Sequence, residues 1–119
     1  MITVDDANPM PAFEQIRSQL AGLILLGSLG ADQRLPSVRQ LAADLRLAPG
    51  TVARAYALLE SEGLVTTHRG AGTRVSVQAD NYPDVLDAAL DFAEAANDRG
   101  LDLDRAILAV RAAWEAMQV

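Results

Sequence analysis

Apolar side chains recur at helical spacing in the first half of the chain and divide it into short amphipathic segments. The segment between Pro11 and Gly27 predicts a helix, because apolar residues repeat every three or four positions. These positions are Phe13, Ile16, Leu20, Leu23 and Ile24. Pro11 suits the first turn of a helix and Gly27 suits its end. We interpret this segment as a supporting helix of the core.

Two shorter helices are predicted next, joined by a tight turn. Ser37 and Gln40 have the spacing of a capping box, in which Ser37 caps the helix and the Gln40 side chain reaches back. The following helix begins at Pro49 and runs to about Glu62. Ala48, which precedes it, has no side-chain acceptor and cannot cap it.

A β-hairpin is predicted after the second of these helices. Leu64–His68 and Thr73–Val77 are rich in β-branched residues and flank Arg69–Gly72, which contains two glycines. Two helices joined by a tight turn and followed by such a hairpin form a winged helix-turn-helix. We therefore predict this fold for residues 10–78, in a chain that is mainly α with a small β-hairpin.

Two further amphipathic helices are predicted within residues 79–119. They lie on either side of a break at Asn97–Gly100, and Asp102 suits the cap of the second. An antiparallel helical pair is the simplest arrangement. Each of these helices carries a stripe of apolar side chains, and two helices alone bury such stripes poorly. The stripes must therefore pack on the winged helix or on a second copy of the chain. We favour a homodimer through this C-terminal dimerisation segment, with contacts at Val85, Ala89, Phe92, Leu103, Ile107, Val110 and Trp114.

The net charge of −6 conceals an uneven distribution. Residues 34–78 hold six arginines against three acids, a charge of +3, whereas residues 79–119 hold nine acids against three arginines, a charge of −6. The phosphate backbone of a nucleic acid would respond to the local positive charge of residues 34–78 rather than to the net charge of the chain. All ten basic residues are arginine, which suits bidentate contacts to phosphate or guanine, but a GC-rich genome is the better explanation of this usage.

Other classes of protein find little support in the sequence. No apolar run approaches the length of a membrane span, no secretory signal is visible, and cysteine is absent, so we expect a soluble cytoplasmic protein. His68 is the only histidine and makes no metal site alone. No catalytic triad, P-loop or dinucleotide fingerprint indicates an enzyme, and no cofactor is expected.

The helix that begins at Pro49 has an outward face of small residues. At about 100° per residue, its inward side consists of Val52, Ala55, Tyr56 and Leu59. Its outward side consists of Gly50, Ala53, Arg54 and Ala57, with Thr51 at the edge. Small side chains permit close approach to a DNA groove, where Arg54 can reach guanine or phosphate. Taken alone, the same face fits a solvated, alanine-rich helix equally well.

Three motifs follow one another within residues 35–75, namely LPSVRQLA, TVARAYALLESEGLV and HRGAGTRV. In this order and with these gaps they resemble the GntR family of bacterial transcriptional regulators, and with the preceding helix the resemblance covers about Met10–Val77. It implies a winged helix that binds operator DNA as a dimer. The C-terminal part, about forty residues in two helices, resembles that of the YtrA-like subgroup.

The resemblance also implies which residues contact DNA. They are Ser37, Arg39, Thr51, Arg54, Tyr56, Arg69, Gly70, Gly72 and Thr73. The helical phase independently favours Thr51 and Arg54 as DNA contacts. The arginines around the hairpin loop favour the hairpin as a further DNA contact. Tyr56 lies near the core boundary by phase, so that only its hydroxyl is expected to reach a phosphate.

The leading hypothesis is a sequence-specific transcriptional regulator. In its simplest form it is a repressor that binds a palindromic operator in double-stranded DNA as a homodimer. The alternative is a winged-helix module that binds another protein without reading DNA sequence. A small-molecule effector is compatible with the sequence, but no polar constellation marks a site for it.

Overall fold

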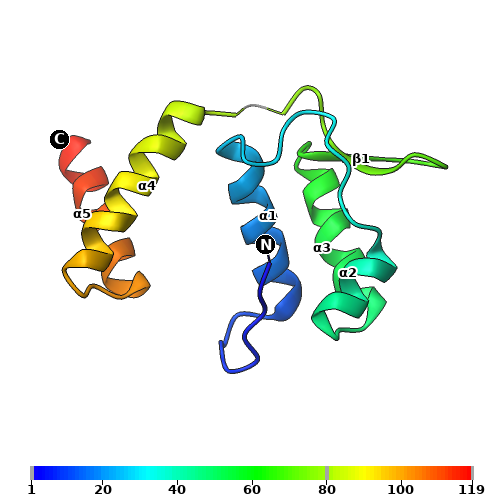
Figure 1. Cartoon of the computed structure of the whole chain (residues 1–119), viewed down its shortest axis with the longest axis horizontal. Coiled ribbons are helices and arrows are strands. Elements are labelled where there is room, and N and C mark those ends of the chain that lie inside the picture. Colours follow the sequence, from blue (N-terminus) through cyan, green and yellow to red (C-terminus); the bar gives the residue numbers. More distant parts are fainter. Residues whose placement is uncertain (1, 80, 119) are drawn as a thin grey trace. The chain divides into compact units, whose positions relative to one another are not determined.

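A computed structural model describes residues 2–79 and 81–118 of the chain. The chain forms two compact units, one extending to Pro83 and the other beginning at Asp84. The elements of the first unit are α1 (Ala12–Leu25), α2 (Val38–Leu45), α3 (Pro49–Ser61), β1 (Val65–His68) and β2 (Gly72–Val75). The second unit consists of α4 (Pro83–Asp98) and α5 (Leu103–Met117), and Figure 1 shows the elements in chain order. The predicted order, a winged helix-turn-helix followed by two helices, is confirmed.

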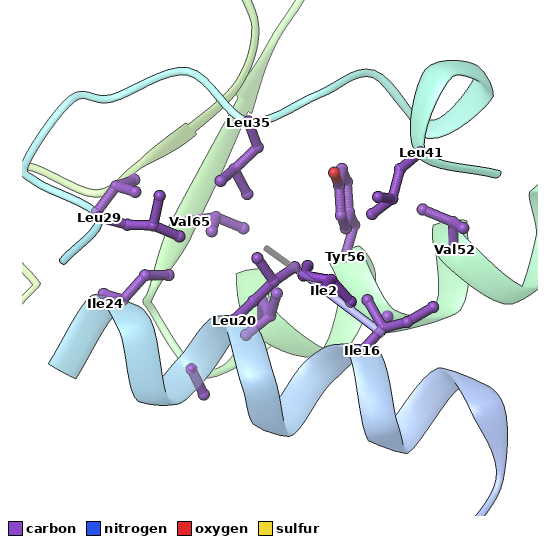
Figure 2. Close-up of a cluster of buried hydrophobic side chains, with 14 of the residues drawn as sticks. Ile2, Ile16, Leu20, Ile24, Leu29, Leu35, Leu41, Val52, Tyr56 and Val65 are labelled. Carbon is purple, nitrogen blue, oxygen red and sulfur yellow. The ribbon is translucent and has the colours of Figure 1, made fainter. Parts of the chain in front are cut away.

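The core of the first unit lies between α1, α3 and the hairpin. In Figure 2, Ile16, Leu20 and Ile24 project from one side of α1 toward residues of the other elements. All three are almost completely buried, as are Leu35, Val52, Leu59, Val65 and Val75. Burial of each such side chain contributes on the order of 1.5–3 kcal/mol, which fixes α3 against α1.

An ion-paired arginine also joins α1 to the end of α3. Arg17 pairs with Glu14 one turn earlier on α1, and its Nη1 atom is 3.1 Å from Oε1 of Glu62, just after α3. The hydrogen bond from Arg17 lowers the pKa of Glu14. The partly exposed pair between Arg17 and Glu62 thus adds a polar contact between α1 and the end of α3.

A segment between α1 and α2 pairs with the hairpin, which the sequence did not predict. The backbone N–H of Asp32 donates to the Val75 carbonyl over 3.0 Å, and that of Leu35 donates to the Thr73 carbonyl over 2.8 Å. The N–H of Val75 donates to the Gln33 carbonyl over 2.9 Å. Residues 32–35 have no alternation of apolar and polar side chains, so nothing in their pattern indicated a strand. The hairpin is therefore anchored at its base along β2.

The residues before α1 also belong to the core of this unit. Ile2 is buried in the hydrophobic cluster, and the Gln19 side chain exchanges hydrogen bonds with the backbone of Thr3. The Gln15 side chain does the same with the backbone of Asp5 and is 6% exposed. The sequence analysis assigned no core residue before Pro11, because Ile2 and Val4 are too few to form a recognisable pattern.

The first unit also extends slightly beyond the predicted boundary between residues 78 and 79. Ala79 packs against the core cluster, and the backbone N–H of Tyr82 donates to the Leu25 carbonyl over 2.8 Å. Tyr82, just before α4 begins at Pro83, is therefore bonded to the end of α1.

In the second unit the chain reverses between α4 and α5. The N–H of Leu101 donates to the Ala96 carbonyl over 3.0 Å, and the Asp102 carboxylate accepts from the N–H of Arg105 over 2.9 Å. The predicted cap at Asp102 is therefore confirmed. Within residues 2–79 and 81–118, no helix has the length and apolar character required to span a membrane.

Candidate nucleic-acid interface

Helix α3 presents a face of small side chains to solvent. Val52, Ala55 and Leu59 are completely buried on its inner side, as the helical phase predicted. Its outer side consists of the exposed residues Gly50, Ala53, Arg54 and Ala57, with Thr51 half-buried at the edge. The helix begins at Pro49 without a side-chain cap from Ala48, as expected. Pro49 has no N–H, and the N–H of Thr51 donates to the Ala48 carbonyl over 3.0 Å.

Arg54 lies to one side of this face, over an aromatic ring of α1. Its Cζ atom is 3.8 Å from the centroid of Phe13, which is a cation–π contact. The sequence placed Arg54 on the outward side of α3 but gave no indication that Phe13 would lie beneath it.

Tyr56 is a core residue in the structure. Its side chain is 5% exposed, and its hydroxyl donates a hydrogen bond of 2.7 Å to the Pro36 carbonyl. Burial raises the pKa of Tyr56 to about 12. A contact between this hydroxyl and a DNA phosphate would require the bond to Pro36 to break, so the position of Tyr56 suits it to hold the start of α2 against α3.

The start of α2 supplies a hydroxyl and an arginine. The Oγ atom of Ser37 accepts from the N–H of Gln40 over 3.1 Å, which confirms the predicted cap. The hydroxyl proton of Ser37 is not used in this bond and can be donated to a ligand. Arg39, in the first turn of α2, is exposed. The predicted return contact of a capping box is wrong, because the Gln40 side chain donates to Asp44 instead, over 2.8 Å.

The hairpin has the antiparallel register expected for a wing. Val65 pairs with Val75 at its base and His68 with Gly72 at its tip, so the loop consists of residues 69–71. Gly70 and Gly72 both have left-handed backbone conformations, with φ of 82° and 74°. The loop side chain of Arg69 is exposed.

The Arg34 side chain lies against the wing, although the sequence analysis did not include Arg34 among the DNA contacts. A Cβ atom added to Gly72 would lie 3.0 Å from Nε of Arg34, so the guanidinium of Arg34 covers this glycine. Arg74 has a partly structural role, because its Nη1 donates to the Asp32 carbonyl over 3.0 Å. Arg34 lies on the segment whose pairing with β2 was also missed.

A hollow of about 240 Å³ separates the small face of α3 from the wing. Ala53 and Ala57 of α3 line it, with Val38 of α2 and with Thr67 and Thr73 of the hairpin. Tyr56 and Glu60 complete its lining. Of the predicted contact residues, Tyr56 and Thr73 line this hollow, whereas Ser37, Arg39, Thr51, Arg54, Arg69, Gly70 and Gly72 do not.

In the second unit, all seven side chains predicted to form a dimer contact are exposed. They are Val85, Ala89, Phe92, Leu103, Ile107, Val110 and Trp114. Phe92 of α4 and Leu103, Ile107 and Val110 of α5 line a groove of about 400 Å³. Trp114 is 62% exposed. Apolar side chains of this size are rarely left in water as a continuous stripe.

Comparison with known proteins agrees with these features. A family model described as bacterial regulatory proteins, gntR family, matches residues 12–75. The HTH-type transcriptional repressor YtrA of Bacillus subtilis (strain 168) is 43% identical over 79 residues, which cover 66% of this chain. This chain spans 61% of the length of that relative.

Solved structures show the same fold. YtrA from Sulfolobus acidocaldarius, a GntR-family transcription factor, is 30% identical with a TM-score of 0.60, and the match covers 79% of this chain and 97% of that chain. The N-terminal domain of AraR in complex with a mutant ORR3 is 27% identical with a TM-score of 0.53, covering 56% of this chain and 96% of that chain.

Helices α2 and α3 joined by a tight turn and followed by the β1–β2 hairpin define a winged helix-turn-helix protein. The chain belongs to the GntR family of bacterial regulatory proteins. The resemblance to this family and to YtrA proteins that the sequence motifs implied is confirmed.

Proposed function

We propose that this protein is a DNA-binding transcriptional regulator that binds its operator as a homodimer. The observation that carries the proposal is the hollow between α2, α3 and the wing, where small side chains such as Ala53, Ala57 and Thr73 form much of the lining. Residues 34–78 hold six arginines against three acids, so this surface lies in the positively charged part of the chain. Such a surface suits the shape and charge of a DNA groove.

Residues of α2, α3 and the wing have distinct roles in this proposal. Ala53 and Ala57 allow α3 to approach base edges, and Thr51 lies at the edge of the same face. Ser37 and Arg39 contact phosphate from the start of α2. Arg69, Gly70, Gly72 and Thr73 bring the wing against the backbone or the minor groove, with Arg34 beside Gly72. Tyr56 contacts no DNA and positions α2 through Pro36.

The homodimer is proposed from the exposed apolar stripes of α4 and α5. A second copy would cover both stripes at once, whereas a single copy leaves them in water. Two identical winged helices joined in this way would recognise a two-fold symmetric operator. The acidic residues Asp84, Asp87, Asp91 and Glu94 would keep the dimer segment away from DNA phosphates.

The direction of regulation is proposed from a relative. The Bacillus subtilis protein is named a transcriptional repressor. We infer the same direction for this chain, through occupation of an operator that RNA polymerase also needs. As a regulator of DNA it would act in the cytoplasm.

The experiment uses duplexes that the wild-type protein selects from a random pool. Arg39→Ala and Arg69→Ala should each weaken binding about tenfold, as expected for loss of a charge-assisted hydrogen bond to phosphate. Each should also lower the slope of log affinity against log salt by about one. Fluorescence anisotropy across a salt series measures both quantities.

Arg99→Ala is the matched control, because it removes the same charge outside the winged helix. Its affinity and salt slope should equal those of the wild type. Binding that survives in both Arg39→Ala and Arg69→Ala at wild-type strength would show that this surface does not bind DNA. A salt-independent interaction would instead support the protein-binding alternative.

A further inference from the structure

The contact between Arg54 and Phe13 links the predicted recognition helix to α1. The Cζ atom of Arg54 is 3.8 Å from the ring centroid, so the guanidinium lies over the face of the ring. Phe13 itself packs against the core cluster and is half-buried, whereas Arg54 is exposed. A ring held by the core thus supports a charged side chain at the surface.

Stacking leaves the hydrogen-bonding capacity of Arg54 available. The five N–H donors of a guanidinium lie in its plane, whereas an aromatic ring occupies only one of its faces. Among the residues that the structure describes, Arg54 donates no side-chain hydrogen bond and forms no ion pair. The contact restricts where the guanidinium lies without using its donors.

The position of the guanidinium favours phosphate over base edges. The hollow beside α3 is lined by Ala53 and Ala57, and Arg54 does not contribute to it. Arg54 lies over Phe13 of α1, and neither residue lines that hollow. In helix-turn-helix complexes the recognition helix reads bases from the groove, and side chains at its margins meet the backbone.

We propose that Phe13 is a positioning residue that holds Arg54 ready to contact a DNA phosphate. Because of this contact, α1 takes part in DNA binding although none of its own side chains needs to reach DNA. The inference rests on the proposed function, since it assumes that the surface around α3 binds DNA. Arg54 then contributes affinity, and sequence is read by the α3 residues that border the hollow.

The test compares Phe13→Leu with Phe13→Tyr in the full chain. Leucine keeps an apolar side chain in the core but removes the ring, so affinity for the selected duplex should fall about two- to fivefold. Tyrosine keeps the ring and should bind within about twofold of the wild type. Thermal unfolding of each variant is measured first, and Phe13→Met replaces Phe13→Leu if leucine lowers the midpoint.

The Arg54→Gln variant distinguishes a positioning role of Phe13 from a merely structural one. It should weaken binding, lower the salt slope by about one, and preserve the ratio of affinities for selected and scrambled duplexes. In an Arg54→Gln background, Phe13→Leu should have no further effect on affinity. A merely structural Phe13 would lower affinity equally in both backgrounds.

Three results would overturn the inference. The first is that Phe13→Leu does not lower affinity, or that it lowers affinity equally in the Arg54→Gln background. The second is an Arg54→Gln protein that loses selectivity while keeping the wild-type salt slope, because Arg54 would then read a base. Both leave the proposed function intact. The third is a wild-type protein that selects no duplex, which would overturn the proposed function as well.

Discussion

At the scale of single residues, Tyr56 shows how one side chain can serve the core and the site together. Its ring lies in the hydrophobic cluster, and its hydroxyl binds the Pro36 carbonyl one residue before Ser37. Ser37 caps α2 and is one of the proposed phosphate contacts. The helical phase placed Tyr56 near the core boundary, but only the folded chain reveals which carbonyl its hydroxyl meets.

Replacement of Tyr56 by phenylalanine should lower the free energy of unfolding slightly at neutral pH and should reduce the loss of stability in alkali. Loss of the hydroxyl should lower the free energy of unfolding by about 1 kcal/mol. Burial raises the pKa of Tyr56 to about 12, above the value near 10 of an unfolded tyrosine. The folded state therefore retains a proton that the unfolded chain releases. The associated stability is complete below about pH 10 and is lost as the pH rises through about 12.

Urea unfolding at about pH 8 and about pH 11 tests this linkage. The wild type should lose more stability between the two conditions than Tyr56→Phe does. Tyr82→Phe is the control, because Tyr82 is 51% exposed and should behave like the wild type. Equal alkaline losses in the wild type and Tyr56→Phe would show that Tyr56 is not the group responsible.

At the scale of elements, the wing depends on two glycines in different surroundings. A Cβ atom at Gly70 would meet no atom within 4 Å, whereas one at Gly72 would lie 3.0 Å from the Arg34 side chain. Both have positive φ angles, so an alanine at either position is strained by roughly 1 kcal/mol. Only Gly72 also determines where a nearby guanidinium can lie.

Gly72→Ala and Gly70→Ala therefore form a matched pair. Both should lower the free energy of unfolding by about 1 kcal/mol. Gly72→Ala should additionally displace Arg34 and weaken binding of the selected duplex severalfold more than Gly70→Ala does. Anisotropy and thermal unfolding of the two variants provide the comparison, and indistinguishable affinities would remove Arg34 from the proposed site.

The sequence predicted the helices and the hairpin because each has its own local signal. Apolar periodicity marked α1, the spacing of Ser37 and Gln40 marked the start of α2, and Pro49 marked α3. The pairing of residues 32–35 with β2 had no such signal, since it depends on backbone groups that meet only in the folded chain. The contact between Phe13 and Arg54 was missed for the same reason, because it joins residues 41 positions apart on two helices.

At the scale of the whole molecule, charge and apolar surface are divided between the two units. Arginines exceed acids in residues 34–78, whereas residues 79–119 are acidic and expose the apolar stripes of α4 and α5. Under the proposed function, the first unit binds DNA and the second unit self-associates. Loss of self-association should therefore change the DNA sequence that the protein recognises.

Trp114 provides the means to separate the two functions. Trp114→Asp places a charge within the apolar stripe of α5 and should give monomers in sedimentation. Ala112→Asp introduces the same residue into the same helix, on its opposite side by helical phase, and should leave the dimer intact. The winged helix should remain folded in both variants, because neither residue lies in its core cluster.

The most direct test of the account is the DNA sequence that each protein recovers from a random pool. The wild type and Ala112→Asp should recover a motif of two half-sites related by two-fold symmetry. Trp114→Asp should recover a single half-site with much lower affinity, or no motif. Recovery of an asymmetric or random sequence by the wild type, or of the same symmetric motif at equal affinity by a monomeric Trp114→Asp, would contradict the account.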